Sequence, residues 1–255
     1  MAERAIIKMK EKTLNIFYYN VGSCNGCDIE VVAGVLLNES KVKTNIVSKP
    51  EKADLVVFTG ILTKKIKPYF LKVLKKLPKN AKKIAFGSCA ISGNVFSSSY
   101  TFAGPLDKFT KIDLYVNGCA PKADEALEDI LAKLGLYSKK KITKGATKYW
   151  RGELKFYSKK CIGCLTCVYH CPAQTIKVYP LAKASSGKPS KRKEFTLSYE
   201  YERCFFCAMC ERKCPTRAII LTRNANMVKN NKNSFITQGK VTKGRVKAKI
   251  DWNKI

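Results

Sequence analysis

Eight of the twelve cysteines fall in two short runs of identical spacing. The runs are Cys161–Pro172 and Cys204–Pro215, and each reads C-x2-C-x2-C-x3-C-P. This spacing binds 4Fe–4S clusters in pairs, because three cysteines of a run hold one cluster and the fourth reaches across to the other. The proline after the fourth cysteine keeps the chain from continuing as a helix. We therefore expect one cluster on Cys161, Cys164, Cys167 and Cys214, and another on Cys204, Cys207, Cys210 and Cys171.

Zinc and disulfides are the alternatives for these thiols. Structural zinc sites usually pair two C-x-x-C knuckles or use histidine, whereas here a third cysteine follows closely and His170 is the only histidine. The first residues do not resemble a secretion signal, and clustered cysteines in a cytosolic chain indicate metal binding rather than disulfides. The two runs therefore predict electron transfer.

The other four cysteines are Cys24, Cys27, Cys89 and Cys119. They occur in three segments, each just after an expected strand and each containing a glycine at or near the cysteine. In an open parallel sheet the carboxyl ends of the strands share one edge, where ligands bind. Glycine lets backbone N–H groups approach an anionic centre closely. By spacing alone zinc and a third 4Fe–4S cluster suit these four thiols about equally, and the neighbouring cysteine runs favour the cluster.

The N-terminal half alternates strand and helix signals. Five apolar, β-rich runs alternate with three segments of helical periodicity; the expected strands are 14–19, 42–47, 55–59, 83–86 and 114–116, and the expected helices 29–37, 66–77 and 123–134. Such alternation predicts an α/β domain with a parallel sheet, doubly wound and flavodoxin-like, over residues 1–137. Residues 138–151 are expected to be a linker.

An internal repeat organises the C-terminal half. Residues 154–161 align with residues 197–204 as short strands entering the cysteine runs, and β-rich segments 175–179 and 218–221 follow them. We expect an α+β domain of the two-cluster, bacterial ferredoxin type over residues 152–222. Residues 184–193 form a polar basic insertion. Residues 223–255, with few large apolar residues, are expected to be an extended basic tail on a partner.

The net charge of +30 is concentrated in the C-terminal half. Residues 1–137 hold 21 Lys and Arg against 13 Asp and Glu, and residues 138–255 hold 28 against 6. Anionic clusters account for part of this charge, and the rest indicates an acidic partner or anionic lipid. Lys188, Lys191, Arg192 and Lys193 of the insertion are expected to steer an acidic soluble ferredoxin. Nucleic acid is not expected, since no basic recognition helix is evident.

The three N-terminal cysteine segments, Gly22–Glu30, Gly87–Gly93 and Asn117–Pro121, carry a resemblance to a known family. Residues 12–135 resemble the small subunit of membrane-bound, energy-converting nickel–iron hydrogenases, which is related to the 20-kDa subunit of respiratory complex I. The C-terminal half is similar to the two-cluster ferredoxin subunit of those complexes, here fused. Cys24-x-x-Cys27 is the hydrogenase arrangement, whereas Lys122 departs from the arginine common in the family.

The resemblance implies three 4Fe–4S clusters that relay electrons between reduced ferredoxin and a nickel–iron site on a separate large subunit. It also implies other membrane subunits and a peripheral place on the cytoplasmic face of the membrane. The longest apolar run, residues 31–37, is too short to cross a bilayer. No complete active site is expected on this chain. A relay in a sulfane-sulfur reductase or another complex I relative, and a stand-alone polyferredoxin, are the alternatives.

Glu30 is the one candidate for chemistry beyond the cysteines. In the hydrogenases that this chain resembles, a glutamate near the first cysteine segment contributes to proton transfer. The alternative is a glutamate in the first turn of a helix, where the helix dipole favours negative charge.

Overall fold

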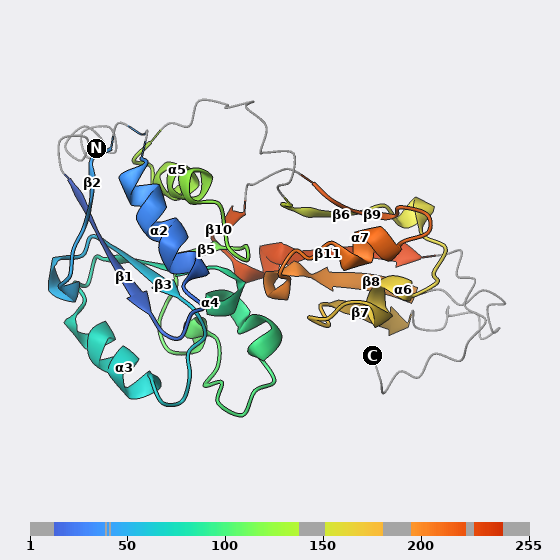
Figure 1. Ribbon diagram of the computed structural model, residues 1–255, viewed down its shortest axis with the longest axis horizontal. Helices are drawn as coiled ribbons and strands as arrows, with labels where there is room; N and C mark the ends of the chain where they lie inside the picture. The colour runs from blue at the N-terminus through green and yellow to red at the C-terminus, as the bar shows by residue number, and fades with distance from the viewer. Residues whose placement is uncertain are drawn as a thin grey trace, which may run out of the picture.

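The computed structural model describes residues 13–38, 40, 42–137, 151–180, 195–222 and 227–241. The expected linker, apart from Arg151, lies outside the described residues, and so does the basic insertion with Lys188, Lys191, Arg192 and Lys193. Figure 1 shows two adjoining parts, a sheet flanked by helices and a smaller part that carries the two cysteine runs.

A sheet of five parallel strands forms the N-terminal domain, in the order β2-β1-β3-β4-β5. The strands are β1 (Leu14–Asn20), β2 (Thr44–Ile46), β3 (Leu55–Thr59), β4 (Lys82–Phe86) and β5 (Leu114–Val116). All five residues of β3 are buried, as expected for a central strand covered on both faces. The parallel sheet confirms the predicted α/β domain.

Helices cover both faces of this sheet (Figure 1). They are α2 (Gly26–Leu36), α3 (Lys67–Lys76), α4 (Ser88–Ser92) and α5 (Ala123–Lys133). Val31 of α2 and Leu131 of α5 pack with the side chains on one face of β3, including Leu55. Phe70 of α3 belongs to the core on the opposite face and meets Phe58 edge to face at 5.3 Å. The five-residue helix α4 was not predicted, because it is too short to show helical periodicity.

Two antiparallel strand pairs build the smaller part. The strands are β6 (Leu154–Phe156), β7 (Ile176–Pro180), β8 (Phe195–Glu200) and β9 (Ile219–Leu221), with the short helices α6 (Thr166–Tyr169) and α7 (Met209–Lys213) between them. Strand β6 pairs with β9, and β7 pairs with β8. The strand entering each cysteine run therefore pairs with the strand leaving the other run. This interleaving carries the end of each run to the beginning of the other.

Short 3-10 turns complete the structure. They are η1 (Pro50–Lys52), η2 (Asn94–Phe96), η3 (Leu106–Lys108), η4 (Ser158–Lys160), η5 (Tyr201–Arg203) and η6 (Lys232–Phe235). Within the described residues no helix has the length and apolar character needed to cross a membrane.

The expectation that the C-terminal tail is unpacked is wrong for residues 227–241. Strand β10 (Val228–Lys229) adds an antiparallel edge to β5 of the N-terminal domain, and β11 (Ile236–Val241) pairs along the whole of β8. Phe235, between them, is fully buried and meets Tyr201 edge to face at 5.7 Å. The segment has few apolar residues, but most of them are buried, and strand pairing needs only the backbone.

We predict that Phe235→Ala lowers stability by about 3–5 kcal/mol, the usual cost of truncating a buried phenylalanine. Phe96→Ala is the matched control, because Phe96 is 50% exposed. Thermal unfolding of the reconstituted chain, followed by circular dichroism, should show a clear drop in midpoint for the first variant alone. Equal midpoints in the two variants would mean that residues 227–241 are not part of the core.

Candidate iron–sulfur centres

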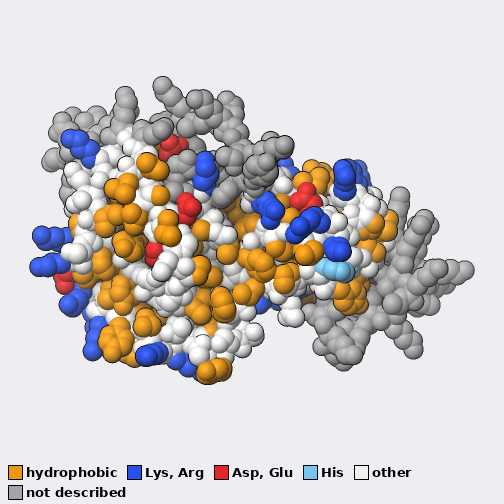
Figure 2. All heavy atoms as spheres, in the orientation of Figure 1, with side chains coloured by type: hydrophobic (Ala, Val, Ile, Leu, Met, Phe, Trp, Pro, Cys, Tyr) orange, Lys and Arg blue, Asp and Glu red, His pale blue; other side chains and the backbone are white. Residues whose placement is uncertain are grey.

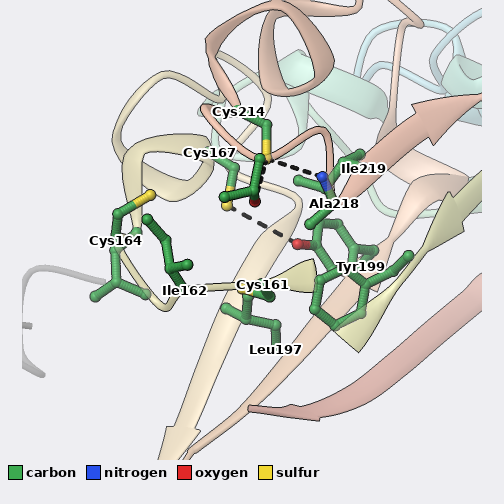
Figure 3. A pocket seen from close by; sticks show the side chains of 12 residues that line it. Cys161, Ile162, Cys164, Cys167, Leu197, Tyr199, Cys214, Ala218 and Ile219 are labelled. Atoms are coloured by element: carbon green, nitrogen blue, oxygen red, sulfur yellow. Dashed lines mark hydrogen bonds between the residues drawn. The ribbon is translucent and has the colours of Figure 1, made fainter. Parts of the chain in front are cut away.

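Four thiols from both cysteine runs surround one small cavity. They are the predicted set Cys161, Cys164, Cys167 and Cys214, and Figure 3 shows Cys214 reaching this cavity from the second run. Cys164 is exposed, whereas Cys167 is buried. The structure therefore brings the predicted four together, with one thiol at the surface.

A second small cavity is lined by the other predicted set. Its cysteines are Cys171, Cys204, Cys207 and Cys210, and none of these four is fully exposed. Burial and the neighbouring thiols, Cys171 among them, raise the pKa of Cys204 to about 12. Cys171 comes from the first run, so both cavities have the predicted exchange of the fourth cysteine.

Backbone N–H groups point at sulfur in both runs. Gly163 N donates to Cys161 Sγ at 3.4 Å, and Phe206 N donates to Cys204 Sγ at 3.2 Å, at equivalent places in the repeat. Ala218 N donates to Cys214 Sγ at 3.2 Å (Figure 3). Hydrogen bonds to sulfur stabilise thiolates and tune cluster potentials, so these amides suit an anionic cluster.

Tyr199 contributes a side-chain contact to the first cavity that the sequence analysis missed. Its hydroxyl lies 3.9 Å from Cys167 Sγ, and the side chain is buried (Figure 3). Burial and the neighbouring Cys167 raise the pKa of Tyr199, and either the hydroxyl or the thiol can donate in this contact. In the internal repeat the equivalent residue is Phe156, whose ring lies 5.0 Å away. A tyrosine at the position where the first repeat has phenylalanine was the signal in the sequence that could have identified this contact.

The three N-terminal segments meet beyond the carboxyl ends of β1, β4 and β5, as predicted. Burial, followed by the thiols of Cys89, Cys119 and Cys24, raises the pKa of Cys27. Burial and two of the same thiols raise the pKa of Cys89 to about 11. Neighbouring thiols whose ionisation is disfavoured, such as Cys27 and Cys89, suit a cationic iron core, because a bound metal ionises such groups.

Polar side chains fix the loop that carries Cys24. Asn20 Oδ1 accepts from the backbone N–H groups of Gly22 and Ser23, both at 2.8 Å. The carboxylate of Asp28 accepts from Thr59 Oγ1 at 2.6 Å and from the Ser23 hydroxyl. Asp28 lies in the first turn of α2, where the helix dipole favours its charge. It therefore joins the first cysteine loop to β3.

The proposed first-turn position of Glu30 is wrong, because α2 begins at Gly26, earlier than predicted, and Asp28 is its first-turn acid. Glu30 is half-buried and lines a small apolar cavity between α2, α5 and the sheet. Apolar side chains, Val31 and Leu127 among them, form the rest of its lining.

Gly87 permits the close approach of the second segment to Cys27. Its φ is +89°, and a Cβ at this position would lie 2.5 Å from Cys27 Sγ. Because a carbon that is not bonded to the sulfur cannot come that close, only glycine lets β4 deliver Cys89 beside Cys27. The glycine before Cys89 thus has a steric role that its position in the sequence suggested.

The three thiol sets form a row. Cys167 of the first cavity contributes to the raised pKa of Cys210 in the second, and Cys119 of the N-terminal set contributes to that of Cys204. Within the described residues, which include all twelve cysteines, no three Cys, His, Asp or Glu side chains are placed to hold a single metal ion. The ligand assignment itself stays a prediction.

Two family models match the chain. The model described as NADH ubiquinone oxidoreductase, 20 Kd subunit, matches residues 24–133, and that described as 4Fe-4S dicluster domain matches residues 160–218. The second match confirms a dicluster iron–sulfur domain in the C-terminal half.

Curated relatives match the N-terminal half. The probable membrane-bound hydrogenase subunit mbhJ of Pyrococcus furiosus is 32% identical over 140 residues, which cover 54% of this chain and 83% of the relative. Formate hydrogenlyase subunit 7 of Escherichia coli is 29% identical over 138 residues, 53% of this chain, and the chain spans about half (54%) of its length. A solved structure of a membrane-bound sulfane sulfur reductase, an archaeal respiratory membrane complex, is also similar. The match covers 52% of this chain and 74% of the chain in that structure, with 27% sequence identity and a TM-score of 0.41.

Anaerobic reconstitution should load about twelve irons per chain, four for each set of cysteines. Cys214→Ala should remove the cluster shared with Cys161, although Cys214 lies in the second run, and Cys171→Ala should remove the other. Iron analysis and electron paramagnetic resonance (EPR) of the reduced protein measure both. A wild-type content near eight irons, or stoichiometric zinc, would refute the N-terminal cluster. Loss of the cluster held by Cys204 in Cys214→Ala would refute the exchange of the fourth cysteine between the two runs.

Gly87→Ala should lose the N-terminal cluster, because its new methyl group would displace Cys27 Sγ. Gly135→Ala is the matched control: Gly135 also has a positive φ, +74°, but a Cβ there meets nothing within 4 Å. Both variants thus place an alanine at a positive φ, and Gly87→Ala alone also brings a Cβ against Cys27 Sγ. Iron content and EPR should reveal loss of one cluster in Gly87→Ala and of none in Gly135→Ala. Retention of every cluster by both variants contradicts this steric role.

Proposed function

The chain belongs to the family of the 20-kDa subunit of NADH–ubiquinone oxidoreductase, and on that premise we propose that it is an iron–sulfur electron-relay subunit of an energy-converting, membrane-bound hydrogenase. It passes electrons between reduced ferredoxin and the nickel–iron site of a separate large subunit. Bound 4Fe–4S clusters supply one-electron carriers. The chain supplies their thiols and the buried surroundings that exclude water.

The observation that carries this proposal is where the exposed thiols lie along the row. Cys164 is exposed in the set at one end, and Cys24 and Cys119 are exposed in the set at the other. The four thiols of the middle set are all partly buried. A relay needs access for a donor and an acceptor at its two ends and insulation between them. This distribution supports entry at the ferredoxin-type end and exit at the N-terminal end.

An exposed apolar face beside the N-terminal set supports a protein partner there. Ile29 and Leu36 of α2 are 66% and 76% exposed. Hydrophobic side chains gather on this face of the molecule (Figure 2). Contiguous exposed apolar surface of this kind marks interaction sites. We assign it to the large subunit, because α2 follows the loop that carries Cys24 and itself carries Cys27.

Several finer assignments belong to the same proposal. The three clusters take the predicted sets of four cysteines, and the N-terminal domain is doubly wound and flavodoxin-like, which the strand order and the helices on both faces support. The excess of positive charge in residues 138–255 suits an acidic soluble ferredoxin. The subunit lies on the cytoplasmic face of the membrane with other subunits of the complex. Glu30 remains a candidate for proton transfer.

Cys24→Ser in the assembled complex tests the proposal. Because Cys24 belongs to the last set of the row, the variant should lose ferredoxin-driven hydrogen evolution while the clusters of the ferredoxin-type half are still reduced, as followed by EPR. Lys79→Ser is the control and should keep activity, since Lys79 is exposed in the turn before β4, at the end of the sheet opposite the thiols. Normal hydrogen evolution in Cys24→Ser would place the N-terminal set off the electron path.

Purification of the native complex separates the remaining alternatives. A co-purifying large subunit with two C-x-x-C pairs supports the hydrogenase. A large subunit without those pairs would favour a sulfane-sulfur reductase or another complex I-like oxidoreductase. Isolation of the chain without partners would favour a stand-alone polyferredoxin.

A further inference from the structure

Three carbonyl oxygens where the chain enters the second cysteine run accept hydrogen bonds from the N-terminal domain. The pairs are Asn117 Nδ2 with Tyr201 O at 2.8 Å, Ser92 Oγ with Glu202 O at 3.2 Å, and Ser88 Oγ with Cys204 O at 2.9 Å. All three donor side chains are buried. Buried polar groups are costly unless paired, so these bonds fix how the two domains meet.

Ser88 differs from the other two donors in what it joins. It precedes Cys89 of the N-terminal set directly in the chain, and its hydroxyl reaches the peptide carbonyl of Cys204 in the middle set. Its hydroxyl oxygen also lies 2.8 Å from Asn117 Oδ1 and 3.1 Å from Gly118 O. Both of these acceptors already receive a backbone N–H, from Gly118 and Ser88 respectively. Three acceptors thus lie within hydrogen-bond distance of the single hydroxyl proton, and we assign it to the Cys204 carbonyl because each of the other two already has a backbone N–H partner.

The connection through Ser88 is covalent except for one hydrogen bond. From Cys204 Sγ it follows that residue's own bonds to its carbonyl oxygen, crosses to Ser88 Oγ, and continues through the backbone to Cys89 Sγ. A route from Cys119 to Cys207 would instead border an open cavity that both residues line. A bonded route couples two redox sites better than a route across open space.

We propose that Ser88 is a positioning residue for electron transfer between the middle and N-terminal thiol sets, with its hydrogen bond to Cys204 as the coupling link. The proposal rests on the proposed function, since it requires clusters at both sets. One electron leaves one set and arrives at the other in each transfer. The hydroxyl proton stays on Ser88 Oγ, and no covalent bond forms or breaks.

The test compares Ser88→Ala with Ser92→Ala in the full, reconstituted chain. Ser92 is the matched control: it is a buried serine of the same helix, and its hydroxyl lies 3.2 Å from both Glu202 O and Ser88 O rather than beside the Cys204 carbonyl. Electrons are injected by laser-flash photoreduction, and their arrival at the N-terminal cluster is followed by EPR of rapidly frozen samples. Cys24→Ser identifies the signal of that cluster. Ser88→Ala should slow the transfer several-fold, and Ser92→Ala should leave it near the wild-type rate.

Two further measurements separate coupling from structure. Cluster potentials and the magnetic interaction between the reduced clusters should be unchanged in Ser88→Ala, because the domains keep their other contacts. Ser88→Thr, which keeps the hydroxyl, should restore the rate. A changed magnetic interaction in Ser88→Ala, slow transfer in a fully loaded Ser88→Thr, or equal slowing by Ser92→Ala would each overturn the proposal. A wild-type chain without the N-terminal cluster would instead overturn the proposed function.

Discussion

Thiols that share a buried space resist ionising together, and this electrostatic constraint governs the whole molecule. The raised pKa values of Cys27 and Cys210 both have burial as the first cause and neighbouring sulfur as the next. Sites of this kind need a cationic core, amides aimed at sulfur, and a chain path that brings distant segments together. The N-terminal domain gathers its four thiols from three loops at one sheet edge, whereas the C-terminal half gathers its two sets by interleaving two strand pairs.

The two halves therefore solve the same problem with different geometries. At the sheet edge, the approach of the loops is limited by sterics, and Gly87 is required where the second loop meets Cys27. In the ferredoxin-type half, the antiparallel pairing of β6 with β9 and β7 with β8 sets the exchange of the fourth cysteine. Between them, the buried side chains of Ser88, Ser92 and Asn117 bond to backbone carbonyls, so the interface is specified by polar pairing.

Cysteine spacing could predict the thiol sets because ligand chemistry is local and tolerates few alternatives. The strands could be predicted for a similar reason: β3 and β5 are apolar runs with the observed limits. The start of α2 was harder, since Asn25 before it has a left-handed backbone and no side-chain cap bond marks the boundary. Ser88, Asn117 and Tyr199 were missed because each acts on a segment far away in the sequence, and isolated polar residues carry no periodic signal. The packing of residues 227–241 was missed because it depends on backbone pairing with β5 and β8.

The path of the chain through β9, β10 and β11 makes the two halves inseparable. After leaving the ferredoxin-type half at β9, the chain adds β10 to the edge of the N-terminal sheet and then returns with β11. In chain order, β10 of the N-terminal sheet lies between β9 and β11, which both belong to the ferredoxin-type half. A single cut in the backbone would therefore leave at least one half without one of its strands. Strand β10 also covers part of the β5 edge, which as an open edge would invite pairing with another chain. The chain is therefore an interwoven fold rather than two modules on a tether, because β10 and β11 tie each half to the other.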